Sequence, residues 1–361
     1  MTFAWFALLA ILIVAYAVLD GFDLGVGAVQ MLVAKTKEER EATLAAVGPF
    51  WGANEVCLVA AGVVLFAGFP ILFAAAFAGY YLPLMMLLWL VVLRGISLEF
   101  RSHLDESMWR SAFDTVLGFS SVLIAIVLGA ALGNVLRGVP LDAEGNFFEP
   151  LWTHFKTSGK TGVLDWYTII TGLTALATLS MHGASYLAAR TEGGLRERCR
   201  RLANRLLPVV LLFTAVSLGA TLAMLPQEIV RQKLSWGWVF PVAVLASVVQ
   251  FWRSSRREQD YKAFLYFASY IAIILAGAAY VSYPVMLRST LDPAYSLTVQ
   301  NSSADAYSLG VGMWWVPLAI ALATGSFIYL YRSFRGSIAV YRPDFPVSVE
   351  TVTTDEEASS D

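Results

Sequence analysis

The chain has 361 residues, of which 58% are hydrophobic and only 14% are charged. A water-soluble domain of this size carries roughly a quarter charged residues, so the composition excludes an ordinary soluble globular protein. The formal net charge of −2 gives no basis for binding nucleic acid. The only two cysteines, Cys57 in an apolar run and Cys199 in a basic segment, predict no disulfide framework.

The apolar residues are grouped in runs long enough to cross a bilayer, which takes about 20 residues of helix. Backbone groups inside lipid must be hydrogen bonded within the protein, so continuous apolar runs predict helices. We therefore expect an all-α, polytopic membrane helix bundle, with a single transmembrane domain over residues 1–340. About nine spans are expected, at residues 3–34, 48–70, 74–96, 113–136, 163–189, 203–225, 236–252, 263–287 and 311–333. The first run starts without a basic leader and is read as a retained helix.

The distribution of basic residues predicts the orientation in the membrane. Of the 25 lysines and arginines, 19 fall in alternate loops that start after the first span and in the C-terminal end, and six fall on the opposite side. Because cytoplasmic loops carry the excess of positive charge, the N-terminus is expected outside and the C-terminus in the cytoplasm. Residues 341–361 are rich in acids and have no basic residue after Pro343, which predicts a disordered cytoplasmic tail.

Two carboxylates lie in the first span, at Asp20 and Asp23. Acids inside a membrane are expensive and mark functional sites by default. Their spacing of three residues places both on one helix face, whereas a stripe of small residues, Gly21, Gly25 and Ala28, is suited to close packing against another helix. The pair predicts proton handling or polar gating. The alternative is that both acids hydrogen-bond to hydroxyl or amide groups and brace the bundle.

The second span opens with Trp51 and continues through Asn54 and Glu55. Glu55 lies near the cytoplasmic end of its helix, and Asp20 and Asp23 lie at or slightly inside the middle of the membrane on the neighbouring antiparallel helix. The three acids are thus expected to mark one polar path in the inner half of the bundle. A metal site from these acids and His182 is the less favoured alternative, because no ligand spacing indicates one.

Asn54 is included with the three acids of the polar path, and Trp51, Arg94 and His182 are second-rank candidates for the same site, each with an ordinary structural explanation beside it. His182 is the only histidine in a span, so paired axial haem ligands cannot be found in the membrane here, and we expect it to be a hydrogen-bonded packing residue. Arg94 is the deepest basic residue at the cytoplasmic boundary, where snorkelling is the simplest explanation. Asp114 and Asp165 lie at the starts of the fourth and fifth predicted spans and are expected to be N-caps.

Several motifs together resemble subunit II of the cytochrome bd-type quinol oxidases. The run Asp20-Gly21-Phe22-Asp23-Leu24-Gly25-Val26-Gly27 is similar to that family's DGFDxGxG signature. The resemblance extends over most of the chain, in the segments Trp51–Val56, Arg94–Asp114, Gly133–Pro140 and His182–Thr191, and more weakly in Ser296–Ser303.

The resemblance implies a haem-free subunit of a quinol:dioxygen oxidoreductase, with no catalytic residue or metal site of its own. The expected partner is a haem-bearing subunit I that holds two b haems and one d haem. A small single-helix accessory subunit, membrane lipid and quinone are further expected partners. Such a complex oxidises quinol near the outer face and reduces dioxygen to water with protons from the cytoplasm, without pumping, in the cytoplasmic membrane of a bacterium or archaeon. Subunit II can contribute to the proton path.

The sequence departs from the family pattern at the start of the second span. The family's acid directly after the tryptophan is Gly52 here, the next glycine is Ala53, and the motif's final tryptophan is Cys57. Either Glu55 takes over the role of that acid, or protons enter through subunit I alone. Two other functions stay open: a proton-coupled secondary transporter, which also uses intramembrane acids, and a purely structural scaffold within the oxidase.

Overall fold

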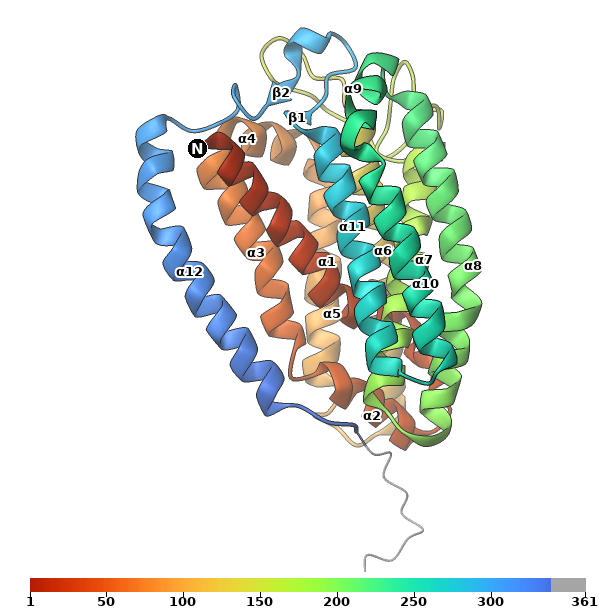
Figure 1. The fold of residues 1–361 in the computed structure, drawn as a ribbon. Helices are drawn as coiled ribbons and strands as arrows, with labels where there is room; N and C mark the ends of the chain where they lie inside the picture. Colours follow the sequence, from red (N-terminus) through yellow and green to blue (C-terminus); the bar gives the residue numbers. More distant parts are fainter. Residues whose placement is uncertain (339–361) are drawn as a thin grey trace, which may run out of the picture.

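A computed structural model describes residues 1–338 and shows a bundle of helices (Figure 1). The described part contains twelve α-helices and one short antiparallel pair of strands. The helices are α1 (Thr2–Val33), α2 (Lys37–Val47), α3 (Trp51–Gly68), α4 (Pro70–Gly79), α5 (Tyr81–Phe100), α6 (Ser107–Arg137), α7 (Trp166–Arg190), α8 (Gly193–Met224), α9 (Gln227–Gly237), α10 (Val239–Arg256), α11 (Asp260–Ser282) and α12 (Ala306–Ser333), and the strands are β1 (Val285–Leu287) and β2 (Leu297–Thr298).

Each of the nine predicted spans corresponds to a long helix among the described residues. Eight of these helices are long and apolar enough to cross a membrane. The ninth, α7, has 25 residues but is not one of the eight, because it carries many polar residues. It lies between α1, α6, α8 and α11, where buried side chains such as Thr168, His182 and Ser185 face protein instead of lipid.

The chain enters and leaves the bundle at opposite ends. The N-terminus lies at the end that also holds α4, α9 and the two strands, whereas α2 and the last turn of α12 lie at the other end (Figure 1). An odd number of crossings produces this arrangement. The assignment of the second end to the cytoplasm stays a prediction from the basic residues, and the predicted acidic tail, 341–361, lies outside the described residues.

The centre of the bundle is the contact between α1 and α7. A Cβ atom built on Gly25 would lie 1.9 Å from the carbonyl oxygen of Leu179, and one built on Gly183 would lie 2.2 Å from the backbone of Gly25. Only glycine allows two helix backbones to approach so closely. The close packing predicted for the Gly21–Gly25 side of the first span is therefore confirmed, and it leaves Asp20 and Asp23 directed towards other helices.

The third predicted span, 74–96, was wrong at its start. The helix that crosses is α5, which begins at Tyr81, and a separate short helix, α4, occupies residues 70–79. Pro70 is the first residue of α4, and Pro83 lies in the first turn of α5. Proline is favoured in the first turn of a helix, and at these two positions it coincides with two helix starts in one apolar run.

One of the two predicted caps is confirmed. Asp165 caps α7, where its Oδ1 accepts hydrogen bonds from the backbone N–H groups of Tyr167 and Thr168 at 2.8 and 2.9 Å. Asp114 is not a cap, because α6 begins seven residues earlier, at Ser107. It is a buried ion-pair partner instead, and accepts from Nε of Arg101 at 2.5 Å.

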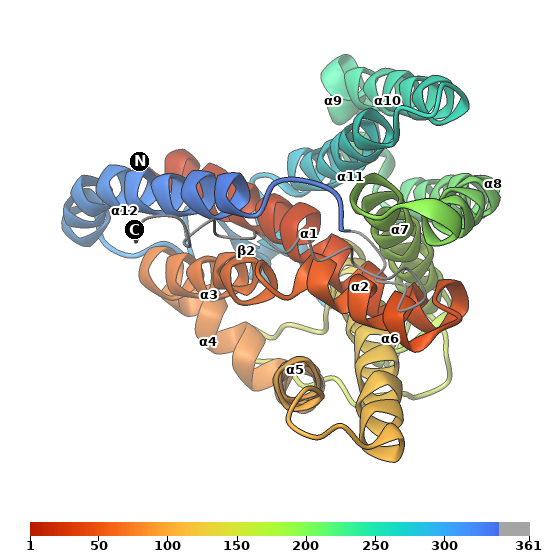
Figure 2. The same ribbon diagram turned by 90° about the horizontal axis from the view of Figure 1, so that it is seen from below.

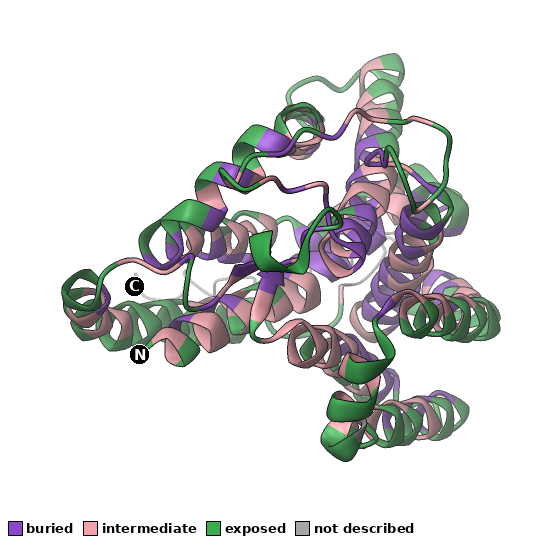
Figure 3. Ribbon diagram, turned by 90° about the horizontal axis from the view of Figure 1, so that it is seen from above, coloured by how far each residue is buried: buried purple, intermediate pink, exposed green. Residues whose placement is uncertain are grey.

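The periphery of the bundle exposes its apolar side chains. Seen along the bundle, α12 stands beside α1 and α3, and α8, α9 and α10 stand on the far side of α7 and α11 (Figure 2). In the view from the other end, buried residues concentrate on the central helices and α12 is mostly exposed (Figure 3). Within α12, only Leu309 is buried. This exposed apolar surface is what a membrane protein presents to lipid or to a partner subunit.

Candidate functional site

Asp20 of α1 and Arg94 of α5 form a buried ion pair. Nη1 and Nη2 of Arg94 donate to the two carboxylate oxygens of Asp20 at 2.8 and 2.6 Å. The residues are 0% and 2% exposed. A bidentate arginine–carboxylate pair is the geometry that best compensates two charges removed from water. Arg94 is therefore not a snorkelling side chain, and its role is to neutralise Asp20.

Asp23, one turn further along α1, forms no ion pair with any other described residue, because the guanidinium of Arg94 is bonded to Asp20. Its Oδ2 accepts a hydrogen bond from the amide Nδ2 of Asn54 on α3 at 2.8 Å, while its Oδ1 is buried without a hydrogen-bond partner. Asn54 is itself held by the carbonyl oxygen of Leu19 and by the hydroxyl of Tyr331 on α12, which donates to Oδ1 of Asn54 at 3.0 Å. The structure thus brings Asp20, Asp23, Asn54 and Arg94 into one site.

Glu55, Trp51 and Gly52 border this site at the start of α3. Glu55 is partly buried and lies within electrostatic range of Arg94 and Asp20. The ring of Trp51 packs beside Gly95 of α5. Gly52 is exposed, and a Cβ atom added there would meet nothing within 4 Å. An acidic side chain at position 52 would therefore fit, although this chain has none.

His182 of α7 is adjacent to the site but turned away from the acids. Its Nε2 lies 3.0 Å from the carbonyl oxygen of Val18. A carbonyl can only accept, so the imidazole must donate through Nε2. The ring is fully buried and stacks on Phe264 at 5.0 Å between ring centroids. This environment supports the predicted role as a packing residue.

A second buried charge cluster, not expected from the sequence, lies at the opposite end of the bundle. The guanidinium of Arg137, the last residue of α6, donates to Asp165, to Oε1 of Glu149 at 2.7 Å and to Oδ1 of Asn134 at 2.7 Å. It also donates to the carbonyl oxygens of Gly138 and Gly162. Nothing in the sequence pairs Arg137 with Glu149, because Glu149 lies in an irregular loop.

Glu149 is the titratable group of this outer cluster. Its Oε1 also accepts from the hydroxyl of Thr161 at 2.6 Å, and its Oε2 has no hydrogen-bond partner. Burial raises the pKa of the Glu149 carboxyl above its ordinary value, although Arg137 and Thr161 act in the opposite direction.

The described residues do not fit a haem or a metal ion within this chain. No group of three or more histidine, cysteine, aspartate or glutamate side chains in residues 1–338 is arranged to hold a metal. The two nitrogens of His182 are enclosed, one bonded to Val18 and the other, Nδ1, buried. His103 and His154 lie outside the helices that cross. We therefore derive no step through a cofactor bound by these residues.

Comparison with known proteins gives a consistent result. A family model described as "Cytochrome bd terminal oxidase subunit II" matches residues 1–334. The cytochrome bd ubiquinol oxidase subunit 2 of Bacillus subtilis is 32% identical over 344 residues, covering 94% of this chain and 97% of that protein. The cytochrome bd-I ubiquinol oxidase subunit 2 of Escherichia coli K12 is 27% identical and covers 92% of both chains.

The fold has a solved counterpart in the bd oxidase from Geobacillus thermodenitrificans. The TM-score is 0.71 at 16% sequence identity, with 92% of this chain and 98% of that chain covered. The resemblance inferred from the sequence motifs is confirmed, and so is the all-α membrane fold.

Proposed function

The chain belongs to the cytochrome bd terminal oxidase subunit II family, and from this premise we propose that it carries protons from the cytoplasm towards the oxygen-reducing partner of its complex. It is a multi-pass membrane subunit of a quinol oxidase complex, which is an oxidoreductase of a respiratory chain. The observation that carries the proposal is the unpartnered Oδ1 of Asp23 beside a fully paired Asp20.

The charges of the site assign different roles to the two aspartates. One arginine neutralises one carboxylate, and the bidentate geometry gives that role to Asp20. Asp23 is then the excess acid, with a single hydrogen bond from a neutral amide. A proton on Oδ1 of Asp23 removes a charge that nothing in the site compensates. The carboxyl group of Asp23 is thus the group that binds and releases a proton. Asp20 stays ionised because it is paired with Arg94.

Glu55 and Asn54 lie between this site and the inner end of the bundle, in the first turn of α3, and Glu55 is within electrostatic range of Asp20 and Arg94. Glu55 is the next residue after Asn54 and is only partly buried, so it can exchange protons with water more readily than Asp23. Asn54 holds Asp23 and Tyr331 together and orients the carboxylate. We propose that Glu55 replaces the family acid missing at Gly52. The partner subunit, packed against the exposed side of α3, would supply the remaining groups of this proton route.

The partner subunit is expected on the side of α3 and α12. Trp314 and Trp315 of α12 are 85% and 66% exposed, and α12 has almost no buried residue of its own. Trp314→Glu should reduce the haem that co-purifies with this chain. The same change at Trp236, which is 71% exposed on α9 across the bundle, should not, and equal losses would remove this assignment.

The finer parts of the proposal follow from family membership. The partner is a subunit I that holds the b and d haems, quinol is the substrate of the complex, and a single-helix accessory subunit is a further candidate partner. The site of action is the bacterial or archaeal cytoplasmic membrane, with the N-terminus outside.

A reduced-minus-oxidised spectrum tests the expected partner. The chain purified gently from its native membrane is compared with the chain expressed alone, and haem b and d bands are expected only in the native preparation. Absence of haem in both would favour the transporter alternative.

The proton role is tested by turnover per haem. Asp23→Asn and Glu55→Gln should slow quinol-dependent oxygen consumption by about tenfold or more at unchanged haem content. Asp20→Asn should instead reduce the amount of assembled complex, since it leaves Arg94 buried without a counter-charge. Normal turnover per haem in Asp23→Asn and Glu55→Gln would leave the scaffold alternative.

A further inference from the structure

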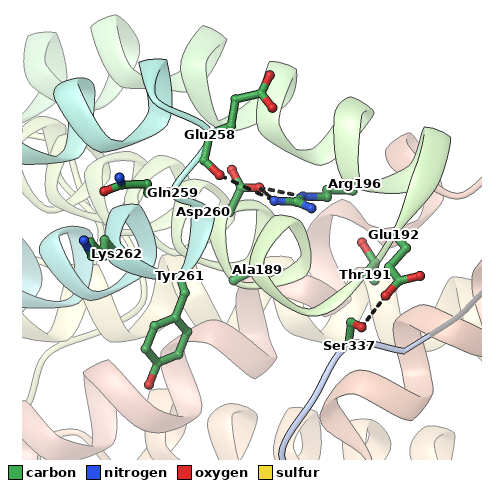
Figure 4. A pocket seen from close by; sticks show the side chains of 10 residues that line it. All are labelled: Ala189, Thr191, Glu192, Arg196, Glu258, Gln259, Asp260, Tyr261, Lys262 and Ser337. Carbon is green, nitrogen blue, oxygen red and sulfur yellow. Dashed lines mark hydrogen bonds and ion pairs between the residues drawn. The ribbon is translucent and has the colours of Figure 1, made fainter.

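The turn between α10 and α11 separates its charges onto two sides. Its two acids pair with arginines of α8: Glu258 lies 2.9 Å from Arg200, and Asp260 lies 2.6 Å from Arg196 and 2.9 Å from Arg200. Figure 4 shows Asp260 joined to Arg196 on one side of the turn and the side chains of Gln259 and Lys262 on the other. The acids of the turn are therefore already committed to α8.

Three basic side chains on the other side have no such partner. Arg253, Arg257 and Lys262 are exposed and make no side-chain hydrogen bond or ion pair with any other described residue. A fourth, Arg256, is directed elsewhere, over the ring of Trp252 at 4.7 Å. The three cations line one pocket of about 280 Å³.

The rest of this pocket is lined by neutral hydrogen-bonding groups: Gln250, Ser254, Gln259 and Tyr266. Ser254 is buried, and its hydroxyl makes no hydrogen bond with another described residue. The pocket thus offers three positive charges and several donors, and no acid among its lining residues. That set matches a phosphate group, whose oxygens are all acceptors.

A neighbouring cavity has a different set of charges, which shows that the excess of positive charge is confined to the basic pocket. The cavity of about 420 Å³ in Figure 4 shares Gln259 and Lys262, but its lining also includes Glu192, Glu258 and Asp260. Its three acids outnumber its two bases, Arg196 and Lys262, and Asp260 is already paired with Arg196. An anion gains nothing from entering there, so the basic pocket is the one that selects negative charge.

We infer that the pocket formed by Arg253, Arg257 and Lys262 binds the phosphate of an anionic phospholipid. It lies where two membrane helices end, at the level at which lipid headgroups are found. Exposed apolar surface flanks it on α11, where Leu265, 44% exposed, lies three residues after Lys262 on the same helix face and can contact an acyl chain. Basic pockets at the ends of transmembrane helices bind anionic headgroups in this way. A soluble phosphate has the same headgroup chemistry but makes no use of these apolar flanks.

The test measures lipid binding by the intact oxidase complex after delipidation in detergent. Native mass spectrometry and thermal unfolding would be followed with added phosphatidylglycerol, with phosphatidylcholine and with inorganic phosphate. The triple variant Arg253→Gln/Arg257→Gln/Lys262→Gln should bind phosphatidylglycerol on the order of 100-fold more weakly. A charge-matched control, Arg201→Gln/Arg205→Gln/Arg256→Gln, removes three exposed cations from the same end of the bundle but outside the pocket, and should bind as the unmodified complex does.

Other outcomes would overturn the assignment. Equal phosphatidylglycerol affinity in the two triple variants would show that bulk charge, not the pocket, attracts the lipid. Protection by inorganic phosphate without any effect of phosphatidylglycerol would indicate a soluble ligand. If the triple variant does not assemble, Lys262→Gln and Lys262→Arg decide: the first should weaken binding about fivefold and the second should preserve it, and equal binding by both would contradict the proposal.

Discussion

The bundle contains two buried charge clusters, named for the sides of the membrane that the basic residues predict: the inner cluster of Asp20, Asp23 and Arg94, and the outer cluster of Arg137, Glu149 and Asp165. Each has one arginine and two carboxylates, yet the two arginines differ in how many hydrogen bonds they make. All three guanidinium nitrogens of Arg137 donate hydrogen bonds, to two acids, an amide and two backbone carbonyls. Arg94 binds only Asp20, and its Nε is buried without a partner.

The two clusters also take their residues from different parts of the helices. The outer cluster is built from the end of α6, the start of α7 and the loop between them. It fixes the ends of these elements to one another. The inner cluster joins the interior of α1 and α5 to the first turn of α3, and its second acid, Asp23, is held by an amide that also contacts α12. The fully bonded arginine of the outer cluster indicates a structural role, although Oε2 of Glu149 has no hydrogen-bond partner among the described residues. In the inner cluster both the arginine and the second acid are incompletely bonded, which leaves positions where a proton or water can bind.

The largest expected effect is from Arg94→Gln. It leaves Asp20 buried without a counter-charge, which costs about 3–5 kcal/mol, so little assembled complex should be recovered. The haem that co-purifies with the subunit measures this. Adding Asp20→Asn removes the stranded charge and should restore part of the yield. A double variant as poor as the single one would show that Arg94 acts through something other than this pair.

Arg137→Gln should also destabilise strongly, by about 3 kcal/mol, because Glu149 and Asp165 lose their common partner. Because the outer cluster has a structural role, we expect Arg137→Gln to change stability alone and not turnover. The fraction that assembles should reduce oxygen at the normal rate per haem, measured with quinol in excess. A lower rate per haem would mean that the outer cluster takes part in turnover.

Glu55→Gln is expected to lower turnover by about tenfold with little change in stability, since the side chain is only partly buried. Gly52→Asp restores the acid that relatives carry after the tryptophan, at a position with open space. Oxygen consumption should recover in Gly52→Asp/Glu55→Gln but not in the uncharged control Gly52→Asn/Glu55→Gln. Recovery in neither would place proton entry in the partner subunit.

The smallest effect concerns pH and Glu149. Since burial raises the pKa of this carboxyl, the folded state binds a proton that the unfolded state has already released. Stability therefore falls as pH rises from the ordinary glutamate pKa through the raised value. Glu149→Gln should flatten the dependence of the thermal midpoint of the complex on pH in this range. An unchanged slope would show that another group titrates.

Much of the fold could be predicted because lipid imposes it. Apolar length located the nine long helices, and the glycines beside Asp20 predicted that the first span packs closely against another helix, which the structure identifies as α7. The ends of helices were harder to predict from the sequence. Asp114 resembled a cap, but it is buried beside Arg101, and that contact depends on a neighbouring helix. The pairs Asp20–Arg94 and Arg137–Glu149 join residues 74 and 12 positions apart, and no local pattern relates them.

The acids of the site were found from sequence because a charge inside a membrane is conspicuous by itself. Their division of roles was not, because it depends on which carboxylate Arg94 reaches. The contribution of Tyr331 was also missed, since a tyrosine near the end of an apolar span is ordinary and only the packing of α12 brings it to Asn54.

The most direct measurement is oxygen consumption per haem by the purified complex carrying Asp23→Asn, compared with Asp165→Asn. Both changes replace a buried aspartate by its isosteric amide. Our account predicts that Asp23→Asn lowers the rate per haem by about tenfold or more with haem content intact, and that Asp165→Asn lowers the yield but not the rate. An unchanged rate per haem in Asp23→Asn would contradict the proton role and leave the subunit as a scaffold.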